Sequence, residues 1–317
     1  GLTGVPNAVA LTHIHNYDTD LRLFSNGYIE LSLLKNLKLK STIGADIREY
    51  RGEYFRPATI PNNGNVAPLP STERKATEKS TEVINWLNEN TITYFESWGK
   101  HELDAVAGVT AQKNIYRYTE ATGSDFPNDK IQTLNNATVK SSKSERKTWT
   151  LLSYLARVNY RYNNKYYLTA SLRTDGSSKF KEMDKRWGVF WSVGGAWRIS
   201  AENWMQSASI WLTDLKIRAD YGVIGNQSGI GRYGGYQTWS YGATGYTTPG
   251  SYAPKGWKLT QNAAPNTALT WEKRKTVDVG LDFRLWDRFY GTLDWYQTNT
   301  TDLLLAAPIS YAMSGQN

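Results

Sequence analysis

The chain has 317 residues and a formal net charge of +8, with 13 Trp, 21 Tyr and no Cys. This length allows one or two soluble domains or a single barrel, and the lack of Cys excludes thiol catalysis and thiolate-bound metals. A mean hydropathy of −0.56, without any run of about 18 apolar residues, excludes a helical membrane protein. Lys and Arg are dispersed rather than gathered in a stripe, which argues against nucleic-acid binding.

Residue 1 is Gly, and no basic, apolar leader follows it. We therefore expect that a signal peptide has been removed or that the chain begins inside a longer protein. The C-terminal segment PISYAMSGQN has the composition of a loop that is cut short.

Apolar and charged residues alternate along much of the chain. In LKLKSTIGADIREY, residues 37–50, apolar side chains alternate with polar ones, and residues 154–162, 215–223 and 276–285 repeat the pattern. A period of two is that of a β-strand with one apolar and one polar face. The run at 276–285 also has the length of about 9–11 residues that a tilted strand needs to cross a bilayer. We predict about ten strands, near 26–34, 37–54, 80–97, 101–119, 148–162, 165–180, 186–199, 213–225, 270–286 and 288–305.

The predicted connections alternate between short and long. Long polar loops are expected near 55–79, 120–147 and 226–269, whereas the intervening connections are tight turns. One larger turn, around AENWMQSASIW, carries the only helical pattern that we identify. Short turns at one end and long loops at the other are typical of an outer-membrane barrel, with the long loops outside the cell.

Tryptophans lie near several predicted strand ends, as expected of residues at the two membrane interfaces. They are Trp98, Trp149, Trp187, Trp197, Trp271 and Trp286. The same residues would also fit the core of a soluble β-sandwich. Such a sandwich, however, needs neither ten long strands nor charge on one whole face of nearly all of them.

These patterns predict an all-β fold, a transmembrane antiparallel β-barrel whose apolar face meets lipid and whose charged face meets a water-filled lumen. Both signs of charge occur on the face expected to line the lumen. We see no pair of carboxylates there that stands out as an acid/base dyad. The residues predicted to face the lumen are Arg157, Arg161, Arg173, Arg218, Asp278, Asp282, Arg284 and Asp294.

Six segments, in chain order, resemble the barrel of the SusC/RagA-type TonB-dependent transporters of Bacteroidetes outer membranes. They are NGYIELSLLKNLKLKSTIGADI, YLTASLRTDGSSKF, RWGVFWSVGGAWRIS, WLTDLKIRADYGVIGNQ, LTWEKRKTVDVGLDF and DWYQTNTTDLLL. The stretch from Leu168 to Gln227 is the most specific part of this resemblance.

The resemblance implies a 22-stranded barrel with an N-terminal plug, covered by a SusD-like lipoprotein lid, in which TonB pulls on the plug to admit oligosaccharides or peptides. The chain lacks a plug and a TonB-contacting segment, and it has too few strands to close such a barrel. We therefore expect residues 1–317 to be a middle section of the barrel domain, without cofactor and without catalytic residues.

Two short motifs resemble ligand-binding sites: a set of three glycines and a pair of histidines. Gly229, Gly231 and Gly234 have the spacing of a dinucleotide fingerprint, but a loop rather than a helix is expected after them. His13 and His15 would lie on one side of a strand and could share a metal, but His101 is expected at the opposite end, and a third ligand is missing. We predict neither a nucleotide site nor a metal site.

Two segments in the predicted loops are candidates for contacts. The basic run KSSKSERK, residues 140–147, is either a solvated loop or a contact for lipopolysaccharide phosphates. The long loop 226–269 carries aromatic side chains that suit sugar rings, although loop packing or contact with the lid explains them equally well. The candidate contact residues are Tyr233, Tyr236, Trp239 and Tyr241.

Two rival functions remain open. Ten strands could close by themselves as a small outer-membrane barrel, such as a protease-like enzyme, if His13 or His15 lay beside carboxylates at the mouth. A soluble glycan-binding β-protein would instead need the apolar face from Val277 to Leu285 to be buried by protein.

Overall fold

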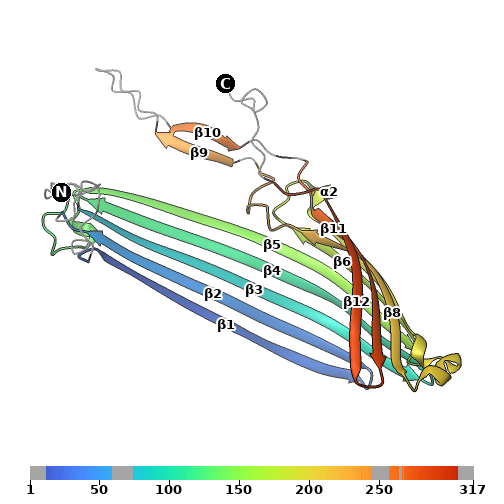
Figure 1. The fold of residues 1–317 in the computed structure, drawn as a ribbon. Coiled ribbons are helices and arrows are strands. Elements are labelled where there is room, and N and C mark those ends of the chain that lie inside the picture. The colour runs from blue at the N-terminus through green and yellow to red at the C-terminus, as the bar shows by residue number, and fades with distance from the viewer. Residues whose placement is uncertain are drawn as a thin grey trace. The chain divides into compact units, whose positions relative to one another are not determined.

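A computed structural model describes residues 12–58, 74–236, 238–243, 257–263, 266 and 268–305. Ten strands form one antiparallel sheet, in which nearly every strand pairs with its neighbours in sequence (Figure 1). Their bounds are β1 His15–Leu34, β2 Leu37–Arg56, β3 Lys75–Trp98, β4 His101–Ser124, β5 Val139–Tyr162, β6 Tyr166–Ser177, β7 Trp187–Arg198, β8 Leu212–Asn226, β11 Glu272–Leu285 and β12 Phe289–Thr301.

The remaining elements are short. A two-stranded hairpin, β9 (Thr238–Ala243) and β10 (Trp257–Ala263), lies within the long connection between β8 and β11. The helical pieces are η3 (Leu134–Asn136), α2 (Met183–Arg186), η4 (Ile199–Ala201) and η5 (Asn203–Ala208). Among the described residues, no helix has the length and apolarity required to span a bilayer.

The predicted order of strands is confirmed, but two strand starts and one loop were predicted wrongly. β1 begins at His15 rather than near 26, and β5 begins at Val139, so the basic run at 140–147 lies in a strand rather than in a loop. The predicted loop 226–269 contains the β9–β10 hairpin. The missed start of β5 is polar on both faces, so its hydrogen-bond ladder continues where the apolar alternation has stopped.

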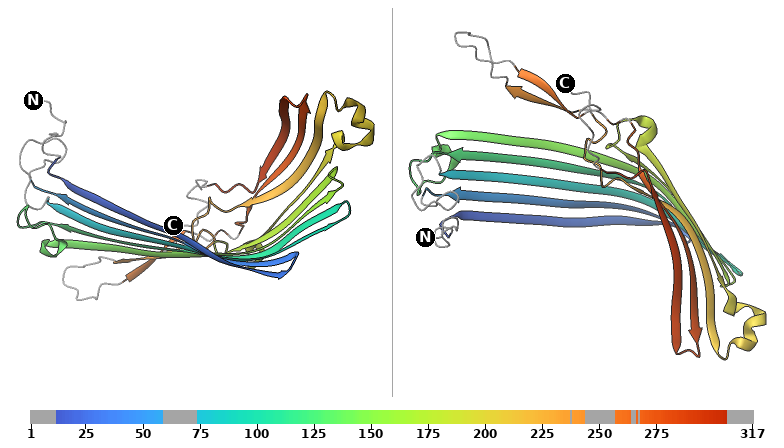
Figure 2. Two further views of the ribbon diagram at one scale, coloured as in Figure 1. Left: turned by 90° about the horizontal axis from the view of Figure 1, so that it is seen from below. Right: turned by 45° about the horizontal axis from the view of Figure 1, so that its top comes forward.

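The alternation of long and short connections is also confirmed. β1 joins β2 through residues 35–36, β3 joins β4 through 99–100, and β11 joins β12 through 286–288. In the turn after β5, Asn163 and Asn164 have φ values of 52° and 53°, a left-handed conformation that Asn tolerates in tight hairpins. Figure 2 shows the strands side by side in two further views.

Packing divides the chain into two compact units. Unit 1 comprises residues 1–27, 43–87 and 112–149, and unit 2 comprises residues 28–42, 88–111 and 150–317. Each of the strands β1 to β5 therefore contributes residues to both units.

Each unit has one small apolar cluster near the ends of its strands. In unit 1, Phe55 packs edge-on against Phe126, with ring centroids 5.4 Å apart, beside Ala76 and Ala137. In unit 2, Phe180, Phe190 and Trp271 form the corresponding cluster with Ile230. Within the described residues, the sheet of unit 2 has no second layer packed against its apolar side chains.

Most apolar side chains of β6, β7, β8, β11 and β12 share one face of the sheet, which we call the apolar face. Val277 and Val279 on this face are 37% and 38% exposed, so the burial that a soluble sandwich requires is absent here. The register places these residues side by side, with Val279 opposite both Ala219 and Trp295. The large residues of the apolar face are Leu168, Leu172, Val189, Trp191, Val193, Ile217, Val277, Val279, Leu281, Leu293 and Trp295.

A matched pair of substitutions in β12 tests which face meets lipid. We expect Leu293→Arg, on the apolar face, to reduce assembly in the outer membrane much more than Thr292→Arg on the other face. An arginine near the bilayer midplane costs about 2–4 kcal/mol, whereas Thr292 lies opposite Asp282 on the polar side. Surface yield and heat-modifiable migration of the full-length protein measure assembly. Equal yields of the two variants would show that the faces are wrongly assigned.

Candidate functional site

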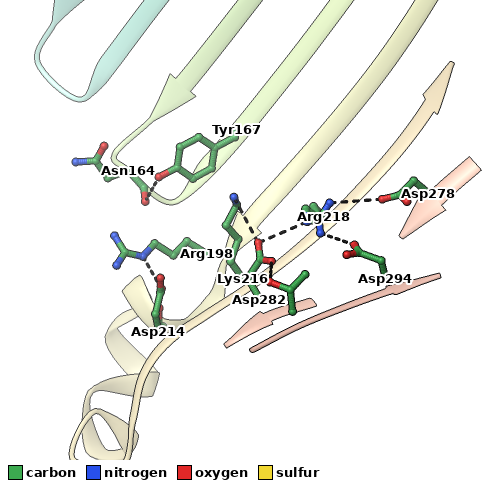
Figure 3. A network of polar contacts seen from close by, with 11 residues as sticks. Asn164, Tyr167, Arg198, Asp214, Lys216, Arg218, Asp278, Asp282 and Asp294 are labelled. Carbon is green, nitrogen blue, oxygen red and sulfur yellow. Dashed lines mark hydrogen bonds and ion pairs between the residues drawn. The ribbon is translucent and has the colours of Figure 1, made fainter. Parts of the chain in front are cut away.

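The face of unit 2 opposite the apolar face, which we call the polar face, carries a connected charge network centred on Arg218 of β8 (Figure 3). The Arg218 guanidinium donates a hydrogen bond to Asp294 of β12 and lies 3.5 Å from both Asp278 and Asp282 of β11. Asp282 also lies 3.7 Å from Lys216 and accepts a 3.0 Å hydrogen bond from the Thr292 hydroxyl. Three strands therefore contribute to one network.

The register and a glycine make this geometry possible. Arg218 pairs with Gly280 across the β8–β11 ladder, and Gly280 pairs with Asp294 across the β11–β12 ladder. A Cβ atom at Gly280 would lie 2.5 Å from Cζ of Arg218. The guanidinium therefore occupies the space above the glycine, because any side chain there would displace it.

The network is partly exposed to solvent, since the side chain of Arg218 is 28% exposed and that of Asp294 is 40% exposed. Its carboxylates are held by cations rather than paired with one another. In the part of the chain that the structure describes, no group of three His, Asp or Glu side chains is placed to hold a metal ion. The arrangement suits a hydrated wall better than acid/base chemistry.

A second group of polar side-chain contacts on the polar face links β4 to β5. Arg161 is paired with Glu102, and Asn159 donates a 3.0 Å hydrogen bond to Asp104. These residues border a cavity of about 260 Å³ that Tyr167 also lines. Glu102 and Asp104 were not among the predicted lumen residues, although the alternation in HELDAV, residues 101–106, indicates that both lie on the polar face.

The other predicted lumen residues are not part of the Arg218 network. Arg173 donates hydrogen bonds to Asp175, at 2.8 Å, and to the buried hydroxyl of Ser153, at 3.0 Å. Arg157 is exposed on β5, and Arg284 lies 3.9 Å from Asp287 near the turn after β11. The structure thus brings together only Arg218, Asp278, Asp282 and Asp294 from the predicted set.

At the end of unit 2 that carries the long connections, which we call the loop end, Lys179 links two turns. Its ammonium group donates to the carbonyl groups of Gln227 and Ile230, at 3.2 and 3.1 Å. Burial, followed by the nearby charge of Arg232, lowers the pKa of Lys179. These contacts tie the turn after β8 to the turn after β6.

The structure describes the side chains of only two of the four predicted contact aromatics, Tyr233 and Tyr236. Tyr233 is 42% exposed and meets Tyr236 edge-on, with ring centroids 6.3 Å apart. Trp239 and Tyr241 lie on β9, paired in the backbone register with Gln261 and Leu259; their side chains lie outside the described residues. Only Tyr233 and Tyr236 are therefore seen together.

At the opposite end of the strands, which carries the short connections and which we call the turn end, aromatic rings form a row across neighbouring strands. His101 stacks on Trp98 and shares a 2.6 Å hydrogen bond with the Tyr160 hydroxyl. Tyr166 stacks on Trp197, and Trp197 contacts Trp204 of η5. Trp98 and Trp197, two of the tryptophans predicted at a membrane interface, belong to this row.

The predicted interface position was wrong for Trp271, which is buried. Trp271 is 3% exposed and packs between Phe180 and Phe190, with its indole N–H donating to the Arg186 carbonyl at 3.0 Å. Trp149 was predicted at a strand end, but β5 begins at Val139, ten residues earlier. Proximity to a strand end therefore did not distinguish a buried tryptophan from an exposed one.

Glu202, between η4 and η5, organises the turn that follows β7. Its carboxylate accepts hydrogen bonds from the Tyr166 hydroxyl at 2.7 Å, the Lys165 ammonium group at 2.9 Å and the Trp197 indole at 3.1 Å. These three donors lower the pKa of Glu202 to about 2. One carboxylate thereby fixes the turn against β6 and β7.

The glycine motif and the histidine pair, the two remaining motifs, form no recognisable functional site in the described residues. β9, rather than a helix, follows the glycines at 229, 231 and 234, so the geometry required for pyrophosphate binding is missing. His15 lies 3.9 Å from a single exposed carboxylate, that of Glu53. Neither arrangement matches a nucleotide site or a catalytic centre.

Substitution of Gly280 tests the network. We expect Gly280→Ala to lower the stability of the full-length protein by about 1–3 kcal/mol, because the added methyl group overlaps the guanidinium. The cost should fall by at least about 1 kcal/mol in an Arg218→Ala background, as measured by thermal unfolding in detergent. Gly195→Ala is the control, since its nearest atom is 3.7 Å away. An equal cost in both backgrounds would contradict the close approach.

The pKa of Glu202 predicts a dependence of stability on pH. An unperturbed glutamate titrates at 4.5 and Glu202 at about 2, so the unfolded state binds a proton first as the pH falls. The stabilisation by Glu202 is therefore complete above pH 4.5 and is lost between pH 4.5 and pH 2. In Glu202→Gln, the thermal midpoint should fall less over this range than in the wild type. The same slope in both proteins would refute the assignment, and Asp184→Asn, on exposed α2, is the control.

Comparison with known proteins places this geometry in a family. Residues 4–317 match the model of the TonB dependent receptor-like β-barrel. The chain is 32% identical over 92% of its length to TonB-dependent receptor P39 of Formosa agariphila, of which it covers 27%. It is 32% identical to TonB-dependent receptor SusC of Bacteroides thetaiotaomicron over 69% of its length, covering 21% of that protein.

The RagAB peptide transporter has a similar structure, with a TM-score of 0.83 and 26% sequence identity. The match covers 95% of this chain and 32% of that one. These findings confirm the resemblance to the SusC/RagA-type proteins. The chain belongs to the TonB-dependent receptor-like β-barrel family.

Proposed function

We propose that the chain forms the middle part of the wall of an outer-membrane importer. Barrels of this family lie in the outer membrane and are receptors and transporters rather than enzymes. The observation that carries the proposal is a single sheet whose exposed apolar face lies opposite the Arg218 network. The apolar face would contact lipid, and the polar face, with Arg157, Arg161, Arg173 and Arg284, would line a hydrated lumen.

We infer the partners and the substrate class from the relatives. The similarity to SusC and RagAB supports a TonB-dependent importer with a SusD-like lipoprotein lid. Action of TonB through a plug is part of this proposal and rests on the family resemblance alone. The substrates would be oligosaccharides or peptides, the latter favoured by the RagAB peptide transporter. Tyr233 and Tyr236, at the loop end, are the described aromatics best placed to contact the substrate or the lid.

A self-contained ten-stranded enzyme fits the structure less well. Closure of ten strands would require β1 to pair with β12, but these two strands are the unpaired ends of the sheet in the described residues. The single contact between His15 and Glu53 also lacks the further groups of an acid/base centre.

The composition of the native complex tests the proposal. We expect an affinity-tagged genomic copy, extracted in detergent, to give a polypeptide far heavier than 35.9 kDa together with a lipidated partner. Mass spectrometry of bound small molecules would distinguish a peptide from an oligosaccharide. A lone chain of 35.9 kDa without a partner would contradict the proposal and favour the small-barrel alternative.

A further inference from the structure

Strands β1 to β5 are longer than a bilayer requires. β3, β4 and β5 each contain 24 residues, whereas β6 and β7 contain 12. A tilted strand crosses the hydrocarbon in about 9–11 residues. About half of each long strand must therefore lie outside the hydrocarbon.

Cross-strand contacts fix the two faces of β4 and β5. Arg161 meets Glu102, and Lys147 lies over the ring of Tyr116, so even positions of β4 share a face with odd positions of β5. This face continues the polar face defined above, because Arg173 of β6 reaches Ser153 of β5. Odd positions of β4 and even positions of β5 therefore lie on the opposite, outward face.

The outward face changes character along each strand. On β4 it is apolar from Leu103 to Ala111 and carries Lys113 and Arg117 farther along. On β5, apolar side chains from Tyr162 to Leu152 give way to threonine, serine and cations. The change falls at residues 111–113 and 150–152, which locates the edge of the hydrocarbon on the loop side of both strands.

Beyond this edge the outward positions of β4 and β5 are basic, whereas those of β2 and β3 also carry glutamates. The outward positions of β4 from 113 to 123 and of β5 from 140 to 150 contain no carboxylate in the sequence. One carboxylate reaches them from β3, since Arg117 pairs with Glu82 at 2.6 Å. We define the basic patch by its four cations: Lys113, Arg117, Lys140 and Arg146.

The basic run at 140–147 is thus divided between the faces. Lys143 and Lys147 lie inward, where both contact Glu145 and approach the rings of Tyr118 and Tyr116. Lys140 and Arg146 are exposed on the outward face. Only half of the run is therefore available to a partner on the membrane side.

We infer that the basic patch binds the phosphate groups of lipopolysaccharide in the surrounding outer leaflet. Cations next to the hydrocarbon edge match the height at which lipid A carries its phosphates, and Arg and Lys are the side chains that bind phosphate best. The inference rests on the outward assignment made in the proposed function. On the same face of β2, Arg51 is paired with Glu49 at 2.8 Å, as Arg117 is with Glu82.

Two double variants of β5 provide a matched test. Lys140→Ala/Arg146→Ala removes two outward cations, and Lys143→Ala/Lys147→Ala removes two inward ones from the same run. Native mass spectrometry of the full-length protein in detergent would measure the binding of monophosphoryl lipid A and of the same lipid after removal of its phosphate. Heat-modifiable migration confirms that each variant is assembled.

We expect the wild type to bind the phosphorylated lipid at least about tenfold more tightly than the dephosphorylated lipid. The outward variant should lose most of this preference, and the inward variant should keep it. Equal binding of the two lipids by the wild type, or equal losses in the two variants, would overturn the inference. Loss of the lipoprotein partner from the outward variant, with lipid preference intact, would assign the patch to the lid instead. Because partner recovery is measured separately, failure of the patch would leave the importer proposal standing.

Discussion

Backbone hydrogen bonding inside hydrocarbon is the constraint on which the rest of this structure depends. A segment in lipid must satisfy each of its amide and carbonyl groups within the protein, and a sheet does so through its ladders. β11 illustrates this, because it pairs along its length with β8 on one side and β12 on the other. Once the strands are paired, a period of two assigns every side chain to one of two media. In the described part of the chain, the outer edges of β1 and β12 have no partner strand.

The polar face shows how charge is accommodated on such a wall. Small residues make room for long side chains that cross the sheet, as Gly280 does for Arg218. Gly194 has the same role beneath Asp220, where a Cβ atom would lie 1.7 Å from the carboxylate oxygen. Opposite charges then meet across strands in the Arg218 network, which lets the wall stay hydrated. This pattern suits passage of a solute better than its chemical conversion.

The two ends of the strands are stabilised differently. At the loop end of unit 2, Phe180, Phe190 and Trp271 form an apolar cluster, and the buried Lys179 ties two turns together. At the turn end, stacked rings and the Glu202 carboxylate take this role. The loop end thus behaves as a small soluble core, whereas the turn end carries exposed aromatic rings suited to a membrane interface.

The sequence by itself determined the strand order, the alternation of loops and turns, and the two faces of most strands, because adjacent residues on a strand point to opposite sides. It also carried the segments that mark the family. It could not determine which charged residues meet, since Arg218 reaches Asp278, Asp282 and Asp294 only through the register of three strands. Nor could it place the start of β5, where water on both faces removes the apolar alternation, or the burial of Trp271, which depends on Phe180 and Phe190. Only the tertiary structure decided these features, because each depends on which distant residues are brought together and local periodicity contains no information about that.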